Sequence, residues 1–187
     1  MVHPESRILN PQSRIALIAG AGIGGLAAGI ALRRAGWDVR IFERARSPRE
    51  LGFALALAPN ALAALREIGI AETVAREGGA VRVFDVRRAD GTLLKRIRFE
   101  RATRRSMVVL RTVLHGALLA AVGDDALNLG HEVRGIELQA DCARLLVADR
   151  APASADVVIG ADGVASVIRG CLHPDEPSPR PSGYHAI

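Results

Sequence analysis

The stretch RIALIAGAGIGGLAAGIAL, residues 14–32, decides the fold, and two interpretations of it compete. Residues 15–32 are eighteen in a row without a charge, close to the length that crosses a bilayer as a helix. The same stretch reads G-x-G-x-x-G at Gly20, Gly22 and Gly25, a spacing typical of turns that hold the pyrophosphate of a dinucleotide. The flanking sequence has to decide between a membrane anchor and a phosphate-binding turn.

The flanking pattern favours the phosphate-binding turn. Ile15–Ala19 is a short apolar run typical of a strand buried on both faces. Residues 24–35 have apolar positions at roughly helical spacing and end before Gly36, and Trp37–Glu43 is expected to form a second strand. The three segments make a β-α-β unit. The five glycines of the uncharged run would be disfavoured inside a helix, so we expect no integral membrane segment.

The glycine spacing has a direct physical purpose. Gly20 permits a tight turn, Gly22 lets the backbone approach a pyrophosphate, and Gly25 allows the helix to pack closely on the strand. The helix that begins here directs its free N–H groups and the positive end of its dipole at the phosphates.

An acidic residue stands where such a site needs one. Glu43 ends the second expected strand, eighteen residues after Gly25, and its carboxylate can accept hydrogen bonds from a ribose 2′-OH. The alternative is a surface acid at the end of a strand. Glu43 would repel a 2′-phosphate, which argues against tightly bound NADP, although Arg44 could soften this effect. From the residues alone, NAD and FAD both remain open.

Composition restricts the other possible classes. The chain has 187 residues, a net charge of +5 and a pI near 10.4, but its arginines are scattered except at 101–105 and only 3% of residues are aromatic. Stacking platforms for bases are therefore scarce, and we expect no nucleic-acid partner. Cys142 and Cys171 fit no metal-ligand spacing, so we expect no metal and a reduced, cytoplasmic location.

The rest of the chain predicts further helices and strands of an α/β fold. The expected helices are at 59–69, 112–122 and 164–172, and the expected strands are at 81–88, 92–99, 126–138, 143–148 and 155–163. The strands at 81–88 and 92–99 flank the turn A-D-G, which predicts a hairpin. We found no nucleophile triad or catalytic carboxylate pair, and the catalytic residues stay unknown.

Four stretches in order resemble one known family. They are ALIAGAGIGGLAAGIALRRAGWDVRIFERA, LGFALALAPNALAALREIGI, VLRTVLHGALL and ADVVIGADGVASVIR. They are similar to the corresponding segments of FAD-dependent aromatic-hydroxylase-type monooxygenases, the para-hydroxybenzoate hydroxylase fold. The resemblance implies a Rossmann-like FAD-binding fold with an incomplete substrate-domain hairpin, FAD as cofactor, and NADH or NADPH as transient electron donor.

The resemblance also implies roles for individual residues. The glycines would line the FAD pyrophosphate, Glu43 would hold the adenosine ribose, Arg44 would lie near the adenosine–pyrophosphate part, and Arg111 would reach the flavin side. The Asp-Gly pair would support FAD and the transient donor. The expected cofactor-binding residues are therefore Gly20, Gly22, Gly24, Gly25, Glu43, Arg44, Arg111, Asp162 and Gly163.

Two of these residues, and Arg169 in the last expected helix, have a purely structural alternative role. Arg111 could simply begin a helix at the surface, Asp162 could be a helix cap, and Arg169 could be an ordinary charge on a helix face. Ala54 departs from the family, which usually has glycine there.

The resemblance implies a division of the chain. We expect a tail at 1–13, a discontinuous FAD-binding domain at 14–75 and 104–173, part of a substrate-domain hairpin at 76–103, and a linker at 174–187. The family's later Gly-Asp motif is absent from the sequence. We therefore expect the N-terminal portion of a monooxygenase of small aromatic molecules, inactive alone and able to form a homo-oligomer or pair with a partner chain.

Two alternatives of other classes stay open from the sequence. One is an NAD-dependent dehydrogenase-like protein, and the other is a non-catalytic FAD-binding remnant that acts with a separate chain.

Overall fold

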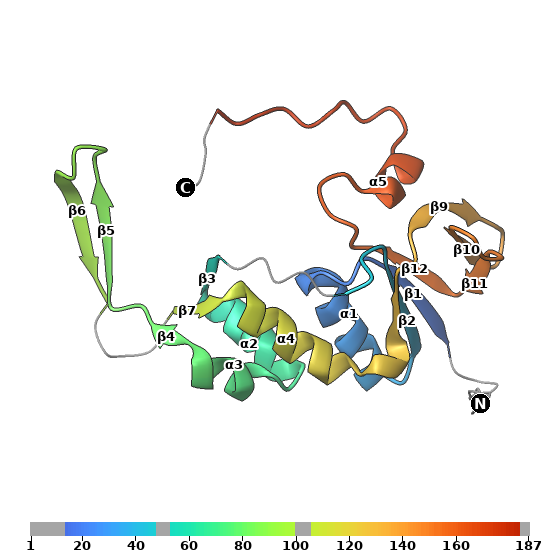
Figure 1. Ribbon diagram of the computed structural model, residues 1–187, viewed down its shortest axis with the longest axis horizontal. Coiled ribbons are helices and arrows are strands. Elements are labelled where there is room, and N and C mark those ends of the chain that lie inside the picture. The colour runs from blue at the N-terminus through green and yellow to red at the C-terminus, as the bar shows by residue number, and fades with distance from the viewer. Residues whose placement is uncertain (1–13, 48–52, 100–105, 184–187) are drawn as a thin grey trace.

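A four-stranded parallel sheet forms the centre of the molecule in the computed structural model, which describes residues 14–47, 53–99 and 106–183 (Figure 1). The strands lie in the order β12-β1-β2-β8. Their bounds are β1 Ile15–Ala19, β2 Asp38–Glu43, β8 Leu127–Leu129 and β12 Val157–Gly160. Because β1 pairs with both β12 and β2, the residues that follow β1 emerge between the ends of two neighbouring strands.

Each face of the central sheet is covered by a different layer. Ala16 and Ile18 of β1 face helices α1 (Ile23–Arg34) and α4 (Arg111–Val122) in one apolar cluster. Leu17 and Ala19 face the other way, into a second cluster that contains Val133 and Leu145 of the antiparallel β9-β10-β11 sheet. Burial on both faces explains why β1 is apolar at every position. The bounds of the covering strands are β9 Val133–Leu138, β10 Ala143–Val147 and β11 Ala153–Ala155.

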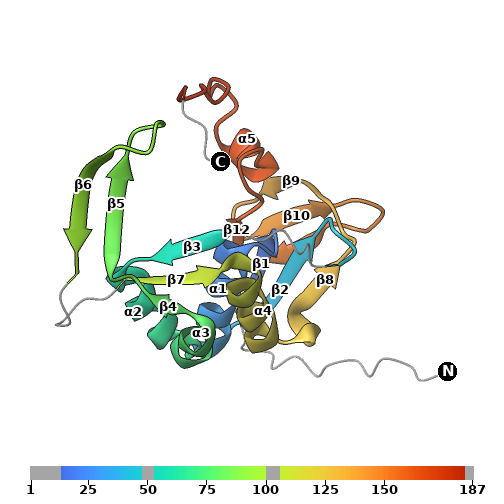
Figure 2. The same cartoon turned by 60° about the vertical axis from the view of Figure 1, so that its left-hand side comes forward.

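A second, smaller sheet lies beside helices α2 and α3 and has the order β3-β7-β4 (Figure 2). Its strand β7 leads directly into α4, so this sheet fixes where α4 begins. The bounds are β3 Ala54–Leu57, β4 Gly79–Ala80, β7 Met107–Leu110, α2 Pro59–Glu67 and α3 Ala71–Glu77.

The hairpin of β5 (Val83–Arg87) and β6 (Leu93–Arg98) projects from the body in both views (Figures 1 and 2). Its large apolar side chains are exposed, Phe84 and Leu94 each to 54%. Asp85 binds the side chains of Arg96 and Arg87 across and along the hairpin, with shortest N···O distances of 2.7 and 3.0 Å. The elements not yet placed are the 3-10 turn η1 (Asp124–Ala126) and helix α5 (Val167–Leu172).

The β-α-β unit, the hairpin and the α/β class agree with the sequence prediction. The single strand expected at 126–138 is wrong, because Gly130, at φ +76°, breaks it into β8 of the central sheet and β9 of the covering sheet. The strand expected at 155–163 ends at Gly160, and the helix expected at 164–172 begins only at Val167.

Some of the predicted segments lie outside the described residues, and one further prediction concerned a membrane span. The tail at 1–13, the arginine cluster at 101–105 and the last four residues of the linker at 174–187 are outside the described residues. Within the described ranges, no helix has the length and apolar character needed to span a bilayer.

Candidate functional site

The glycine loop joins β1 to α1 at the carboxyl edge of the central sheet, and two of its glycines are required by close packing. Gly20 has φ +99°, and a Cβ there would lie 2.4 Å from the carbonyl oxygen of Ala161. A Cβ on Gly25 would lie 2.0 Å from the carbonyl oxygen of Gly20. Gly25 thus serves the packing of α1 on the loop, as the spacing predicted.

The other two glycines of the loop face open space. A Cβ on Gly22 or Gly24 would meet no atom within 4 Å. Gly22 is the N-cap of α1 and its carbonyl accepts the first helical bond, from the Leu26 N–H at 3.0 Å. The first three N–H groups of α1 therefore have no partner within the helix, and the positive end of the helix dipole lies where an anion can approach.

Glu43 binds the glycine loop through its carboxylate. One oxygen, Oε2, accepts the N–H of Ala21 at 3.0 Å, and the other, Oε1, accepts the N–H of Ala45 at 2.9 Å. The side chain is half-buried, so it is not a solvated surface acid. Since each carboxylate oxygen has two acceptor positions, these two bonds leave room for a hydroxyl donor.

His115 of α4 contacts the same residue of the loop from the opposite side. Its Nε2 lies 2.8 Å from the carbonyl oxygen of Ala21. A carbonyl can only accept, so Nε2 must carry the proton. The sequence analysis predicted no binding role for His115, which lies within an expected helix. Its spacing of four residues from Arg111 places both on one face of α4, but this spacing alone does not indicate a contact with the glycine loop.

Arg111 is the first residue of α4 and comes directly after β7. Its backbone N–H donates to the carbonyl of Phe53 at 2.9 Å, and the neighbouring Ala54 pairs with Leu110 across the small sheet. Arg111 therefore does begin a helix with an exposed side chain, and the strand before it fixes where that side chain starts.

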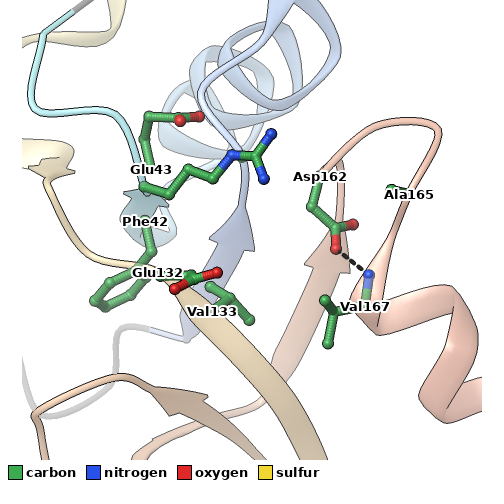
Figure 3. A pocket seen from close by; sticks show the side chains of 9 residues that line it. Phe42, Glu43, Glu132, Val133, Asp162, Ala165 and Val167 are labelled. Carbon is green, nitrogen blue, oxygen red and sulfur yellow. Dashed lines mark hydrogen bonds between the residues drawn. The ribbon is translucent and has the colours of Figure 1, made fainter.

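Two adjacent pockets flank the glycine loop and share Glu43 and Arg44. The first, drawn in Figure 3, is also lined by Gly20 and Asp162. The second has a volume of about 260 Å³. It is also lined by Gly22 and Arg111, which were predicted from the sequence, and by His115, which was not.

Six of the nine predicted residues thus come together around the loop. The remaining three, Gly24, Gly25 and Gly163, line neither pocket. The second pocket is below the range of about 300–1,000 Å³ typical of whole-ligand sites, so it can hold only part of a dinucleotide.

Asp162 follows β12, and its carboxylate binds the first turn of helix α5. Its carboxylate accepts the N–H of Val167 at 2.7 Å, which Figure 3 shows as a dashed line. It also accepts the N–H of Ile168 at 3.3 Å and the hydroxyl of Ser166 at 2.6 Å. The N-cap of α5 is Ser166, whose hydroxyl accepts the N–H of Arg169 at 3.0 Å. Asp162 is therefore not the N-cap itself but a second acceptor for the first turn of the helix. Glu43 and Asp162 lie on either side of the end of β1 in Figure 3.

Arg169 lies on α5, where the alternative interpretation made it an ordinary charge on a helix face. Its guanidinium donates to the carbonyl of Val164 at 2.7 Å and pairs with Glu176 at 2.8 Å, so it ties the helix to its flanking segments.

The arrangement suits a dinucleotide and offers little to a metal. The N-terminus of α1 and the cations of Arg44 and Arg111 can face a pyrophosphate, while Glu43 can accept from a ribose hydroxyl. Among the residues that the structure describes, no group of three His, Cys, Asp or Glu side chains is placed to hold a metal ion.

Comparisons with known families and proteins show what this chain is similar to. The family described as FAD binding domain matches residues 14–182. Aurachin C monooxygenase/isomerase of Stigmatella aurantiaca is 37% identical over 172 residues, which cover 90% of this chain and 45% of that protein. The FAD-dependent urate hydroxylase of Mycolicibacterium vanbaalenii is 33% identical over 175 residues, which cover 90% of this chain and 44% of that protein.

Solved structures agree with the fold. The tetrameric form of 2-methyl-3-hydroxypyridine-5-carboxylic acid oxygenase matches with a TM-score of 0.76 and 27% identity, covering 86% of this chain and 42% of that one. Klebsiella pneumoniae HpxO complexed with FAD and uric acid matches with a TM-score of 0.72 and 27% identity, covering 84% and 41%. The chain spans about half the length, or less, of the curated relatives it matches.

Proposed function

The chain belongs to the FAD binding domain family of flavin-dependent monooxygenases, and on that premise we propose how its residues hold the cofactor. The pyrophosphate lies at the N-terminus of α1, against the open faces of Gly22 and Gly24. The observation that carries this proposal is the clustering of two cations, an acid and a free helix N-terminus around the two pockets beside the loop.

Each side chain has a separate task in the proposed site. Glu43 accepts from the adenosine ribose with the acceptor positions that its two loop bonds leave. Arg44 and Arg111 both line the second pocket, and in the proposed site they face the phosphates and the flavin side. Asp162 and Gly163 support the cofactor from the end of β12. Gly20 and Gly25 act indirectly, by letting the strand, the loop and the helix approach closely.

We propose that this unit serves a monooxygenase that hydroxylates an aromatic or similar small molecule. Bound FAD would supply the redox chemistry, with electrons from NADH or NADPH and oxygen from O₂. The chain covers 45% of one such relative, and in this proposal the residues that it does not match complete the ring-binding pocket. The described residues alone therefore bind FAD weakly and do not hydroxylate.

The domain boundaries of the chain and its location in the cell are parts of the same proposal. Residues 14–75 and 104–173 form the FAD-binding domain, 76–103 the first hairpin of a substrate domain, and 174–187 a linker. The protein works in the cytoplasm, without nucleic acid.

The first experiment is an absorbance spectrum of the purified chain, followed by titration with FAD and with NAD. Flavin bands, or quenching of FAD fluorescence with no binding of NAD, support the proposal. Arg111→Ala should weaken FAD binding, whereas Arg66→Ala, which removes an exposed arginine on α2, should not. Retention of NAD in place of FAD would point to the dehydrogenase-like alternative.

One observation favours a second candidate, a FAD-binding chain completed by a separate polypeptide. The apolar side chains of the β5-β6 hairpin lie open to solvent, and such surfaces mark sites of contact. Light scattering on the chain alone and with a co-expressed candidate partner tests this. A mixed oligomer supports the partner, whereas a homo-oligomer or a monomer that hydroxylates unaided refutes it.

A further inference from the structure

The peptide groups on either side of Ala21 are fixed by side chains from two different elements. The N–H of Ala21 donates to Oε2 of Glu43, on β2, at 3.0 Å. Its carbonyl faces Nε2 of His115, on α4, at 2.8 Å. Ala21 itself is only 5% exposed. The middle residue of the G-A-G turn is thus held from both sides.

This double contact determines the orientation of the N-cap that follows. In a trans peptide the carbonyl of one residue and the N–H of the next point in opposite directions. When His115 fixes the carbonyl of Ala21, it therefore also fixes the direction of the Gly22 N–H. Gly22 has no Cβ contact to restrain it, and glycine is the residue with the most backbone freedom.

We propose that His115 is a positioning residue of the FAD site. It donates its Nε2–H to the Ala21 carbonyl and, through that peptide, holds Gly22 and the N-terminus of α1 in the orientation that receives the pyrophosphate. Ordering the loop before binding lowers the entropic cost of binding. The inference rests on the proposed FAD site, and His115 acts on the cofactor through Ala21.

The donor, and not the imidazole ring as such, is what this role requires. Gln carries an N–H donor at nearly the same reach as Nε2 of His, Asn carries the same amide on a shorter side chain, and Leu has no donor. The series His115→Gln, His115→Asn and His115→Leu therefore separates the hydrogen bond from simple packing. His131→Leu is the matched control, because His131 is also half-buried but does not line the pocket of Ala21 and His115.

The first measurement is the affinity for FAD and for ADP by calorimetry. A lost hydrogen bond predicts that His115→Leu and His115→Asn weaken both ligands equally, by about 3- to 10-fold, while His115→Gln and His131→Leu stay within about twofold of the parent. Unchanged affinity in His115→Leu and His115→Asn overturns the proposal. Weaker FAD with unchanged ADP also overturns it, because His115 would then contact the flavin directly.

The second measurement needs no cofactor and separates the two proposals. Glu43 protects the Ala21 amide, so hydrogen exchange of this amide in the apo chain reports how often the loop opens. Because His115 holds the same residue through its carbonyl, His115→Asn and His115→Leu should open the loop more often and speed this exchange by about 3- to 10-fold, whereas His115→Gln should restore the parent rate. Equal exchange in all variants overturns the role of His115. If the parent chain binds neither FAD nor ADP, the proposed function fails, and exchange at Ala21 still decides whether His115 fixes the loop. Should His115→Leu fail to fold, the comparison of Gln with Asn carries the test.

Discussion

Adding one methyl group at Gly25 should destabilise the fold, although alanine is the better helix former. The new Cβ would stand 2.0 Å from the Gly20 carbonyl oxygen and 3.3 Å from Cβ of Ala161. Real Cβ atoms essentially never come within 3.0 Å of such an atom, so α1 and the loop must separate by about 1 Å. The atom in the way belongs to the backbone, and no flexible side chain can yield.

Two opposing effects set the size of the change. Overpacking of this kind costs about 1–3 kcal/mol, and the backbone contact places Gly25→Ala at the upper end. Replacing glycine by alanine in a helix returns at most about 1 kcal/mol. The net loss in free energy of unfolding is about 2 kcal/mol, which for a chain of this size lowers Tm by about 4–8 °C.

Gly24 offers a matched control one residue away in the same helix. A Cβ there meets nothing within 4 Å, so Gly24→Ala should leave stability unchanged or raise it by up to about 1 kcal/mol. Urea unfolding of both apo variants, followed by circular dichroism, gives the comparison. If Gly25→Ala is as stable as Gly24→Ala, the close approach of α1 to Gly20 is not a packing constraint. In the proposed site Gly24→Ala should instead weaken FAD binding, since the added methyl lies on the open face.

Three further predictions concern the carboxylates. Glu43→Ala leaves two backbone N–H groups without their acceptor and should lower the free energy of unfolding by about 1–3 kcal/mol; Glu43→Gln keeps one acceptor oxygen and should lose less, and equal losses in urea unfolding would contradict this. Asp162→Ala removes the acceptor of the Val167 and Ile168 N–H groups but leaves the N-cap Ser166, and it should cost about 1 kcal/mol, read from the same unfolding curves. An unchanged midpoint would contradict this role of Asp162. The hydrogen bond from Arg96 holds the pKa of Asp85 well below its usual range. The stability from this ion pair should therefore be fully present above the unfolded pKa of about 3.9 and lost only as pH falls through the lower folded pKa; a carboxyl NMR titration of Asp85 centred near pH 4 would refute it.

Local signals explain which parts of the fold were predictable from the sequence. The apolar run of β1, the glycine spacing and the stop at Gly36 all act within a few residues of one another, and they predicted β1, α1 and β2 closely. Strands β3 and β7 went unpredicted because each is formed by pairing with a partner about fifty residues away, and the A-L-A-L sequence of β3 has weak strand propensity. Helix α3 spans only 7 residues, about two turns, which is too short for a helical periodicity to stand out in the sequence.

The residues of the candidate site divide in the same way, into those placed by local sequence signals and those placed by contacts between distant parts of the chain. Glu43 was predictable because its place at the end of β2 is set by the spacing from the glycines. The contact of His115 with Ala21 joins residues 94 apart in sequence, and only the packing of α4 beside α1 creates it. No pattern near His115 distinguishes a histidine that holds a loop from one that fills a helix face.

The structural and cofactor-binding roles of the acidic residues are compatible. Glu43 ends β2 and Asp162 follows β12, the two neighbours of β1 in the sheet, and each carboxylate accepts backbone N–H groups from the chain beside it. A carboxylate oriented in this way is fixed before any ligand arrives, and the acceptor positions that remain can serve a hydroxyl group. Alanine at either position removes both roles together. The informative comparison is therefore between alanine and the amide variant, because an amide keeps one acceptor oxygen for the loop while it loses the charge and half of the acceptor capacity that a ribose would use.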